Sequence, residues 1–494
     1  MNDRERIVVI LKENAYNYPA FPFNPREKYP ELKLLPYDSE IDPKNYVYEI
    51  IRKGFFMYNL DCGNYGTQKW NPLSKIVSKG NTVVIKPNLV RDRHPLGEKA
   101  VLATVTHSSL LRPIIDYTIL ALKGKGKIII CDAPFQSTDF DKVCEINGLR
   151  KLVDFYKTNT KDVQVSLLDL RKERMKYEGR TMKPDGSFGE KRIVQLKGDP
   201  LGYTIIDLGD NSFHSEIDTY WKLYAIPDYE TKNLRKYHTQ KKHCYSIPNT
   251  ILKADVIISV PKLKSHRKAG ITLALKNFVG ICDSKSFLPH HRIGTPQEKG
   301  DEYPHEPGIL RLIKDGLIKI MMNVPMARMS IPFLEKQLLE SGAWHGNDTV
   351  WRTILDLNII ARYANEEGIL CSNSQRKFLF IVDGIIGQEE EGPVFGFPKK
   401  CGVTILGTNP CAVDYVAAKL VGFDIGQLKL ITTPLERKNE IRYPLVNYDV
   451  SDVTVVSNVG EYVKIHELKR ERSLKFLAPN GWKILEKDRQ IDRK

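Results

Sequence analysis

The stretch of sequence that decides the fold reads ADVIISVPKLKSHRKAGITLALKNFVGICDSKSFLPHH and covers residues 254–291. Its apolar run from Val256 to Val260 predicts a buried strand that stops at Pro261, because proline cannot donate to a sheet ladder. In an α/β protein, ligands bind just beyond the carboxyl ends of the strands. The residues that follow this strand are strongly basic and predict a receiver for an anionic ligand: Lys262, Lys264, His266, Arg267 and Lys268.

Outside this stretch, short β-rich runs alternate with helical runs. A predicted helix from Leu110 to Leu122 separates the first two strands, and another helix begins near Pro410. This alternation predicts an α/β fold with a mainly parallel, layered sheet built from βαβ units. The remaining predicted strands are Thr82–Ile85, Lys127–Cys131, Phe378–Val382 and Val403–Leu406.

The chain also divides by composition. We expect a loop-rich N-terminal extension that wraps the core (1–80), an α/β core that carries the basic motif (81–300), a mainly helical insertion or lid (301–375), the continuation of the core (376–430) and a charged C-terminal extension (431–494). The sequence assigns no role to either extension.

Each predicted strand is followed by polar or charged residues. Because the carboxyl ends of parallel strands meet at one edge of a sheet, we expect these residues to form a single site. The strand ends are marked by Lys86, Asn88, Asp132, Lys262, Lys264, Asp383 and Asn409.

The chemistry of these residue types suggests roles. Lys276 lies in a mostly apolar run, which lowers the pKa of a lysine and makes it a usable nucleophile or base. His266 can move protons near neutral pH, and Asp383 can orient a partner or bind a cation. We therefore predict His266, Lys276 and Asp383 as catalytic residues. The predicted substrate-binding residues are Lys86, Asn88, Asp132, Lys262, Lys264 and Asn277.

The composition limits the classes of binding partner that we expect. The net charge is +15, but the basic residues are spread along the chain and accompany no nucleic-acid-binding motif, so small anions are favoured over nucleic acid. No apolar run approaches the ~18 residues of a membrane span, and the N terminus lacks a signal-peptide pattern, so we expect a cytoplasmic protein. The eight cysteines are scattered singly, which predicts that the chain carries no iron–sulfur cluster or zinc ribbon of its own.

Seven ordered motifs between about residues 80 and 425 resemble the family catalogued as domain of unknown function 362. Many of its members look like iron–sulfur proteins with a cysteine-rich ferredoxin segment, which this chain lacks, and the family implies no settled activity. The motifs are VVIKPNLV, GKGKIIICDAP, ADVIISVPKLKSHRKAGITLALKNFVG, LPHHRIG, GNDTVWRTILDLN, IVDGIIGQEEEGPVFG and GTNPCAVDYVAAKLVG.

The spacing of His266, Gly270 and Lys276 is also similar to that of the lactate racemases that use a nickel-pincer nucleotide. This resemblance implies a lysine-linked cofactor on Lys276 and a metal ligand at His290 or His291. The chain departs from that family in the residues before Lys276, which are Leu-Ala-Leu, and in its first loop, which reads Lys-Pro-Asn. A divalent metal and a lysine-linked cofactor therefore both stay open.

Three functional hypotheses remain. The first is an enzyme that binds an anionic carboxylate or phosphate and performs proton transfer or lysine-based covalent chemistry, in its sharpest form a racemase or epimerase. The second is a transferase or ligase that acts on a nucleotide-linked substrate. The third is a non-catalytic protein that binds an anionic metabolite or an acidic partner.

Overall fold

The structure is a computed structural model of the whole chain. It describes residues 5–11, 16–38, 40–182, 188–226, 231–304, 342–458, 460–464 and 474–489. Most of the predicted helical insertion falls on residues 305–341, which lie outside the described residues.

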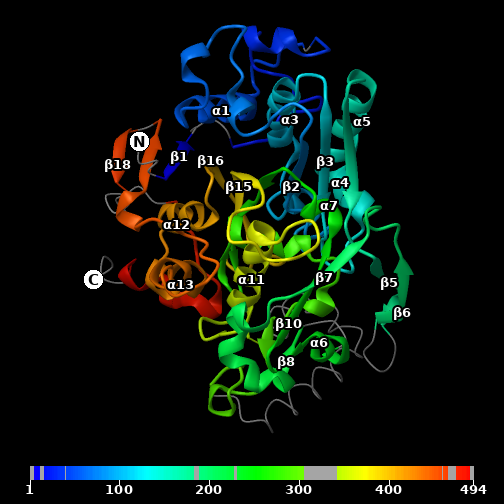
Figure 1. Cartoon of the computed structure of the whole chain (residues 1–494), viewed down its shortest axis with the longest axis vertical. Coiled ribbons are helices and arrows are strands. Elements are labelled where there is room, and N and C mark those ends of the chain that lie inside the picture. Colours follow the sequence, from blue (N-terminus) through cyan, green and yellow to red (C-terminus); the bar gives the residue numbers. More distant parts are fainter. Residues whose placement is uncertain are drawn as a thin grey trace.

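One large sheet organises the chain (Figure 1), with strands in the order β18-β17-β1-β16-β15-β11-β2-β3-β4. Strands β15, β11, β2, β3 and β4 pair in parallel, whereas β16 runs antiparallel to both of its neighbours. The predicted α/β fold with a mainly parallel sheet is therefore confirmed. The strands are β1 (Arg6–Leu11), β2 (Thr82–Pro87), β3 (Gly126–Asp132), β4 (Val163–Asp169), β11 (Val256–Val260), β15 (Lys377–Glu389), β16 (Phe397–Gly407), β17 (Thr454–Ser457) and β18 (Gly460–Lys464).

Both faces of the sheet are covered by helices. Because side chains alternate along a strand, Val83 packs into the core beneath α1 (Tyr46–Met57), α3 (Ser108–Leu122) and α5 (Leu149–Asn159). Its neighbour Val84 packs into the core on the opposite face, beneath α11 (Val350–Tyr363), α12 (Pro410–Val421) and α13 (Lys429–Glu436). The sheet is thus the middle of three layers, which explains its near-continuous apolar strands.

The basic motif forms a strand of its own. After Pro261 the chain resumes as β12 (Lys262–His266), which pairs in parallel with β15 so that Lys262 lies opposite Asp383. Strand β13 (Gly270–Thr272) then returns antiparallel to β12. Because a strand has a period of two, Lys262, Lys264 and His266 leave β12 on the same face. The strand therefore extends the sheet edge and aligns the three basic side chains.

Two features differ from the sequence-based expectation. The N-terminal run RIVVIL forms β1, which lies inside the sheet between β16 and β17, because its apolar residues are buried on both faces. The grouping of Asn409 with the other strand ends is wrong. Because β16 is antiparallel, its carboxyl end lies at the opposite edge, where Asn409 accepts a hydrogen bond from the Cys411 amide (2.9 Å) and caps α12.

Smaller elements complete the fold, and β8 and β10 lie at the end of the molecule opposite α1 and α3 (Figure 1). The short helices are α2 (Glu98–Val101), α4 (Phe140–Ile146), α6 (Thr231–Tyr237), α7 (Asn249–Leu252) and α8 (Ala274–Asn277). The small sheets are β7 (Tyr203–Asp207) with β10 (Lys242–Pro248) and β9 (His238–Thr239), β8 (Tyr224–Ala225) with β14 (His291–Arg292), and β5 (Glu173–Met182) with β6 (Phe188–Gln195).

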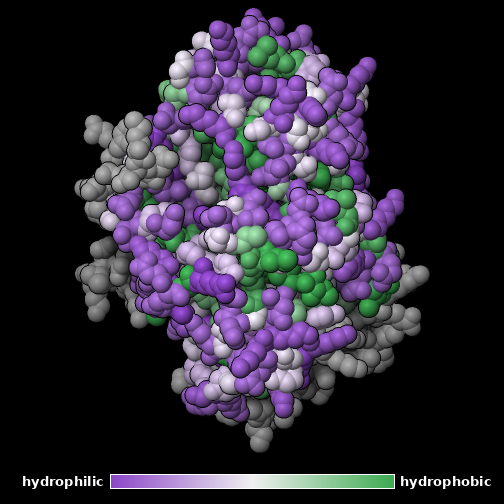
Figure 2. All heavy atoms as spheres, in the orientation of Figure 1, coloured by the Kyte–Doolittle hydropathy of each residue, from purple (hydrophilic) through white to green (hydrophobic). Residues whose placement is uncertain are grey.

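Hydrophilic residues cover most of the face seen in Figure 2, and hydrophobic residues gather mainly near its centre, in the region of α11 and β7. None of the helices in the described part of the chain combines the length and the apolar character needed to cross a bilayer.

Candidate functional site

A buried ion pair forms where β2 and β3 end. Lys86 Nζ lies 2.7 Å from Asp132 Oδ1, and both side chains are buried. Asp132 Oδ2 also accepts a hydrogen bond from the Leu89 amide (2.7 Å). The backbone of Gly280 lies so close that a Cβ atom there would stand 2.0 Å from Asp132 Oδ1. Asp132 therefore neutralises Lys86, and glycine at 280 leaves room for the pair.

Asn277 ties the ends of β2 and β11 together. Its Nδ2 donates to the Lys86 carbonyl (3.0 Å) and to Ser259 Oγ (2.9 Å), while its Oδ1 accepts from Lys86 Nζ (3.3 Å). These contacts use the donor and acceptor groups of the amide, so Asn277 holds the backbone and the lysine in position.

A second buried ion pair joins β12 to β15. Lys262 Nζ lies 3.0 Å from Asp383 Oδ2, and both side chains are fully buried. Tyr18 donates to Asp383 Oδ1 (2.8 Å) and accepts from Lys262, and its ring stacks on that of His107 with centroids 4.0 Å apart. The His107 amide donates to Asp383 Oδ2 (3.0 Å). Asp383 is therefore fully engaged as the counter-ion of Lys262.

Three further lysines have no carboxylate partner in the part of the chain that the structure describes. Lys264 Nζ donates to the Thr104 carbonyl (2.6 Å) and to Asn88 Oδ1 (3.0 Å). Lys285 Nζ donates to the carbonyls of Ala133 (2.8 Å) and Val279 (3.2 Å). For Lys276 the described residues supply neither a hydrogen bond nor an ion pair. We call Lys264, Lys276 and Lys285 the uncompensated lysines.

Burial changes the acidity of the uncompensated lysines. It lowers the pKa of Lys264 well below the ordinary value, and the nearby charges of Lys276 and Lys262 lower it further. Burial and, secondarily, Lys285 lower the pKa of Lys276 from 10.5 to about 7. Burial likewise lowers the pKa of Lys285 to about 8. A lysine with a pKa near neutrality is available in both its cationic and its amine form.

Two histidines near Lys276 have opposite hydrogen-bonding character. His266 Nδ1 accepts from the amides of Lys268 (3.0 Å) and Ala269 (3.1 Å), so its proton resides on Nε2. His290 Nδ1 lies 2.7 Å from the Leu288 carbonyl and must donate to it, which leaves a lone pair on Nε2. Burial, followed by the charge of Lys276, lowers the pKa of His266 well below its ordinary value and that of His290 to about 3. His266 thus offers a donor and His290 an acceptor.

Lys276 is carried on a firmly anchored turn. The Asp414 carboxylate of α12 accepts from the amides of Ala274 (2.7 Å) and Leu275 (3.1 Å) at the start of α8. Asn358 of α11 donates to the Leu275 carbonyl (2.9 Å). Such anchoring fixes the position of Lys276 relative to the sheet edge, which suits a functional side chain.

The predicted site residues therefore fall into distinct groups. Lys86, Asp132, Asn88, Asn277 and Lys264 form one hydrogen-bonded network, and Lys276 and His266 adjoin it through the charges of Lys264 and Lys276. Lys262 and Asp383 pair internally beside it.

The two predicted metal ligands differ in burial. His290 keeps part of its surface accessible, whereas His291 is buried on β14 opposite Ala225. Within the described ranges, no group of three or more His, Cys, Asp or Glu side chains is arranged to hold a metal ion.

Sequence reasoning missed several contributors. Tyr18 comes from the N-terminal segment, where no motif marked it. Lys285 lies within the quoted stretch 254–291 and Asp414 within the helix predicted to begin near Pro410. Neither was predicted as a site residue, because only tertiary contacts bring them to the site. His107 was also missed. Its side chain accepts from the Ser109 amide and caps α3, a role that Ser, Thr, Asp or Asn usually fills.

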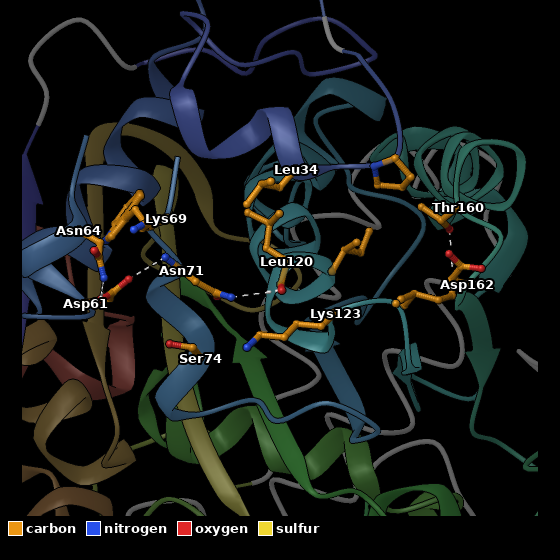
Figure 3. A pocket seen from close by; sticks show the side chains of 15 residues that line it. Leu34, Asp61, Asn64, Lys69, Asn71, Ser74, Leu120, Lys123, Thr160 and Asp162 are labelled. Carbon is orange, nitrogen blue, oxygen red and sulfur yellow. Dashed lines mark hydrogen bonds between the residues drawn. The ribbon is translucent and has the colours of Figure 1, made fainter. Parts of the chain in front are cut away.

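A cavity of about 680 Å³ lies elsewhere (Figure 3). Lys123, Gly124 and Val163 line it near the amino ends of β3 and β4, and Asp61 and Asn71 line it from the N-terminal segment. It is therefore at the edge of the sheet opposite to the uncompensated lysines.

Fold and site together define an α/β protein with a buried cationic site at the carboxyl edge of a mainly parallel sheet. The family model described as Domain of unknown function (DUF362) matches residues 83–182 and 222–419, which is more than half of the chain. The chain belongs to this family. The predicted membership is thus confirmed, and the family description states no activity.

Comparison with individual proteins adds little. No curated protein matches the chain. A solved structure from Thermotoga maritima, a structural-genomics target, is 10% identical with a TM-score of 0.29, and the alignment covers 72% of this chain and 54% of that one. The chain thus spans about half the length of that protein, and a likeness this low carries no argument. The similarity to the nickel-pincer lactate racemases stays a resemblance of three positions.

Proposed function

We propose that this chain is an enzyme that binds an anionic small molecule, a carboxylate or phosphate, at the carboxyl edge of the sheet and moves protons on it. The observation that carries the proposal is the group of uncompensated lysines. Burying a cation without a counter-ion is costly, and an anionic ligand would remove that cost. A bound anion favours the cationic form of a lysine, and an ammonium has three N–H donors. Lys264 and Lys285 each use two on protein carbonyl or amide oxygens, which leaves one donor each for a ligand.

Proton transfer is supported by the groups beside these lysines. His266 offers an N–H and His290 a lone pair, so one can donate a proton while the other accepts. Lys276, with its pKa of about 7, can serve as a base or as a nucleophile. Isomerase-type chemistry on a hydroxy acid or sugar acid would need such a donor and acceptor. Asp383 and Lys262 pair with each other and support the site instead of contacting the substrate.

The first test is the affinity for simple anions. Inorganic phosphate, lactate and citrate would be titrated into the protein by calorimetry. We expect Lys264→Gln combined with Lys276→Gln to weaken the best binder at least tenfold, because each lost charge-assisted contact is worth about 1.5–3 kcal/mol. Affinity should also fall as the pH rises through about 7, since Lys276 then loses its charge.

Lys151 offers a matched control because it is exposed on α5 and no described hydrogen bond or ion pair joins it to the site residues. Lys151→Gln should leave anion affinity unchanged. If Lys151→Gln and the double variant lost anion affinity equally, the loss would come from the lower net charge alone, and the proposal would be contradicted. Binding without turnover of any carboxylate or phosphate tested would favour a non-catalytic binding protein. Selective binding of nucleotides would favour a transferase or ligase.

A further inference from the structure

Lys276 differs from the other lysines of the site in the partners of its amine. Lys86 and Lys262 each have a carboxylate, and Lys264 and Lys285 each have two protein oxygens. The described residues give Lys276 Nζ none of these partners, although the turn that carries it is anchored by Asp414 and Asn358. The residue as a whole is only partly buried. The fold thus holds an unengaged amine at a fixed, reachable position.

The surroundings of this amine suit addition to a carbonyl group. A neighbouring cation favours the neutral, nucleophilic form of a lysine, and the charge of Lys285 lowers the pKa of Lys276 in this way. His266 presents an N–H, and His290 presents a lone pair. Dehydration of a carbinolamine needs one group that gives a proton to the departing oxygen and one that takes a proton from nitrogen.

We propose that Lys276 forms an imine with the carbonyl carbon of an anionic oxo compound, a 2-oxo carboxylate being the simplest, whose negative charge lies against Lys264 and Lys285. This inference rests on the proposed function and names its substrate class. The Lys276 nitrogen attacks the carbonyl carbon, forming a C–N bond. The carbonyl oxygen takes up two protons and leaves as water, while nitrogen gives up its two protons and the C=N bond forms. No oxidant or reductant is consumed.

An anionic group beside the carbonyl would give the uncompensated lysines a counter-ion. The free donors of Lys264 and Lys285 can hold a carboxylate while the adjacent carbon faces Lys276. A neutral ketone would leave these lysines uncompensated and gain no such orientation. The imine would in turn act as an electron sink, which stabilises a carbanion on the neighbouring carbon and suits the proton transfer proposed above.

Borohydride trapping tests the inference without knowledge of the natural substrate. The whole chain would be incubated with pyruvate, reduced with sodium borohydride, and measured by intact mass and peptide mapping. We expect one reduced pyruvate adduct on the peptide that carries Lys276, formed at least tenfold faster than on any surface lysine. Trapping should increase as the pH rises through about 7, because the free amine becomes more abundant.

Three comparisons make the result decisive. Acetone, a carbonyl without an anion, should give little adduct at Lys276, and lactate, an anion without a carbonyl, should give none. Lys276→Arg and, separately, Lys276→Met should remove the site-specific adduct, whereas Lys151→Arg should retain it; circular dichroism would verify that each variant is folded. Adducts spread evenly over surface lysines would overturn the inference.

Failure of the inference can be told apart from failure of the proposed function. If lactate binds in calorimetry and loses affinity in the Lys264→Gln and Lys276→Gln variant, but pyruvate is never trapped, the imine is wrong and the anion site stands. If neither pyruvate nor any other anion binds, both proposals are contradicted.

Discussion

Replacing Lys276 by methionine should stabilise the protein while it removes the reactive amine. Methionine has a similar length but carries no charge to desolvate, and no described hydrogen-bond partner of Lys276 would be orphaned. A gain in stability on substitution is typical of residues that serve function at a cost in stability.

The magnitude follows from the pKa of Lys276, which is about 7 in the folded chain against an ordinary value of 10.5. The unfolded state therefore binds more protons between these values, and the folded state gains stability as the pH rises through that window. Fully counted, the buried amine costs about 4 kcal/mol at pH 7 and about 2 kcal/mol at pH 9. Because the residue is only partly buried, we expect roughly half of each: ~2 and ~1 kcal/mol.

Urea unfolding at the two pH values measures these differences. Lys276→Met should raise the free energy of unfolding, and its advantage over the natural chain should shrink from neutral to alkaline pH. Lys151→Met, at an exposed position, controls for a general effect of charge. A Lys276→Met variant that is less stable than the natural chain, or whose advantage does not change with pH, would refute the assignment of Lys276 as a desolvated, unpaired amine.

Other perturbations test the supporting structure. Gly280→Ala would place a methyl group 2.0 Å from Asp132 Oδ1 and 2.6 Å from Lys86 Nζ. Breaking that ion pair should lower the free energy of unfolding, measured in urea, by about 3–5 kcal/mol. An unchanged urea midpoint would contradict the close packing at Gly280. Tyr18→Phe removes the hydrogen bond to Asp383 and should cost about 1–2 kcal/mol while anion affinity stays the same, since no described contact of Tyr18 reaches an uncompensated lysine. Acid should destabilise the chain, because burial lowers the pKa of His238 and that of His290 from 6.5 to about 3. As the pH falls between these values, each histidine should lower the free energy of unfolding by about 1.4 kcal/mol per pH unit. A free energy of unfolding that does not change over this pH range would exclude buried neutral histidines.

Much of the fold was predictable because its signals are local. The apolar strands, the βαβ unit around α3 and the convergence of Lys86, Asp132, Lys262 and Asp383 at one edge all followed from short runs and the geometry of parallel sheets. The direction of β16 was not predictable in this way, because an apolar strand reads the same in either orientation.

The site was predictable only in part. The basic residues after β11 indicated where the site lies, but the partner of each lysine depends on tertiary contacts. Lys262 and Lys264 are two residues apart in one strand, yet Lys262 meets Asp383 and Lys264 meets only neutral oxygens. When the partner carboxylate lies on another strand, no local sequence pattern predicts whether a lysine is paired.

The central claim is that Lys264, Lys276 and Lys285 form an anion site inside the protein. Anomalous diffraction from crystals soaked in sodium bromide at pH 6, where Lys276 is cationic, tests this most directly. A bromide peak in contact with the amines of Lys264 and Lys276, and its loss in the Lys264→Gln and Lys276→Gln variant, is the predicted result. Bromide bound only at surface lysines, with the space beside Lys276 empty, would contradict the account.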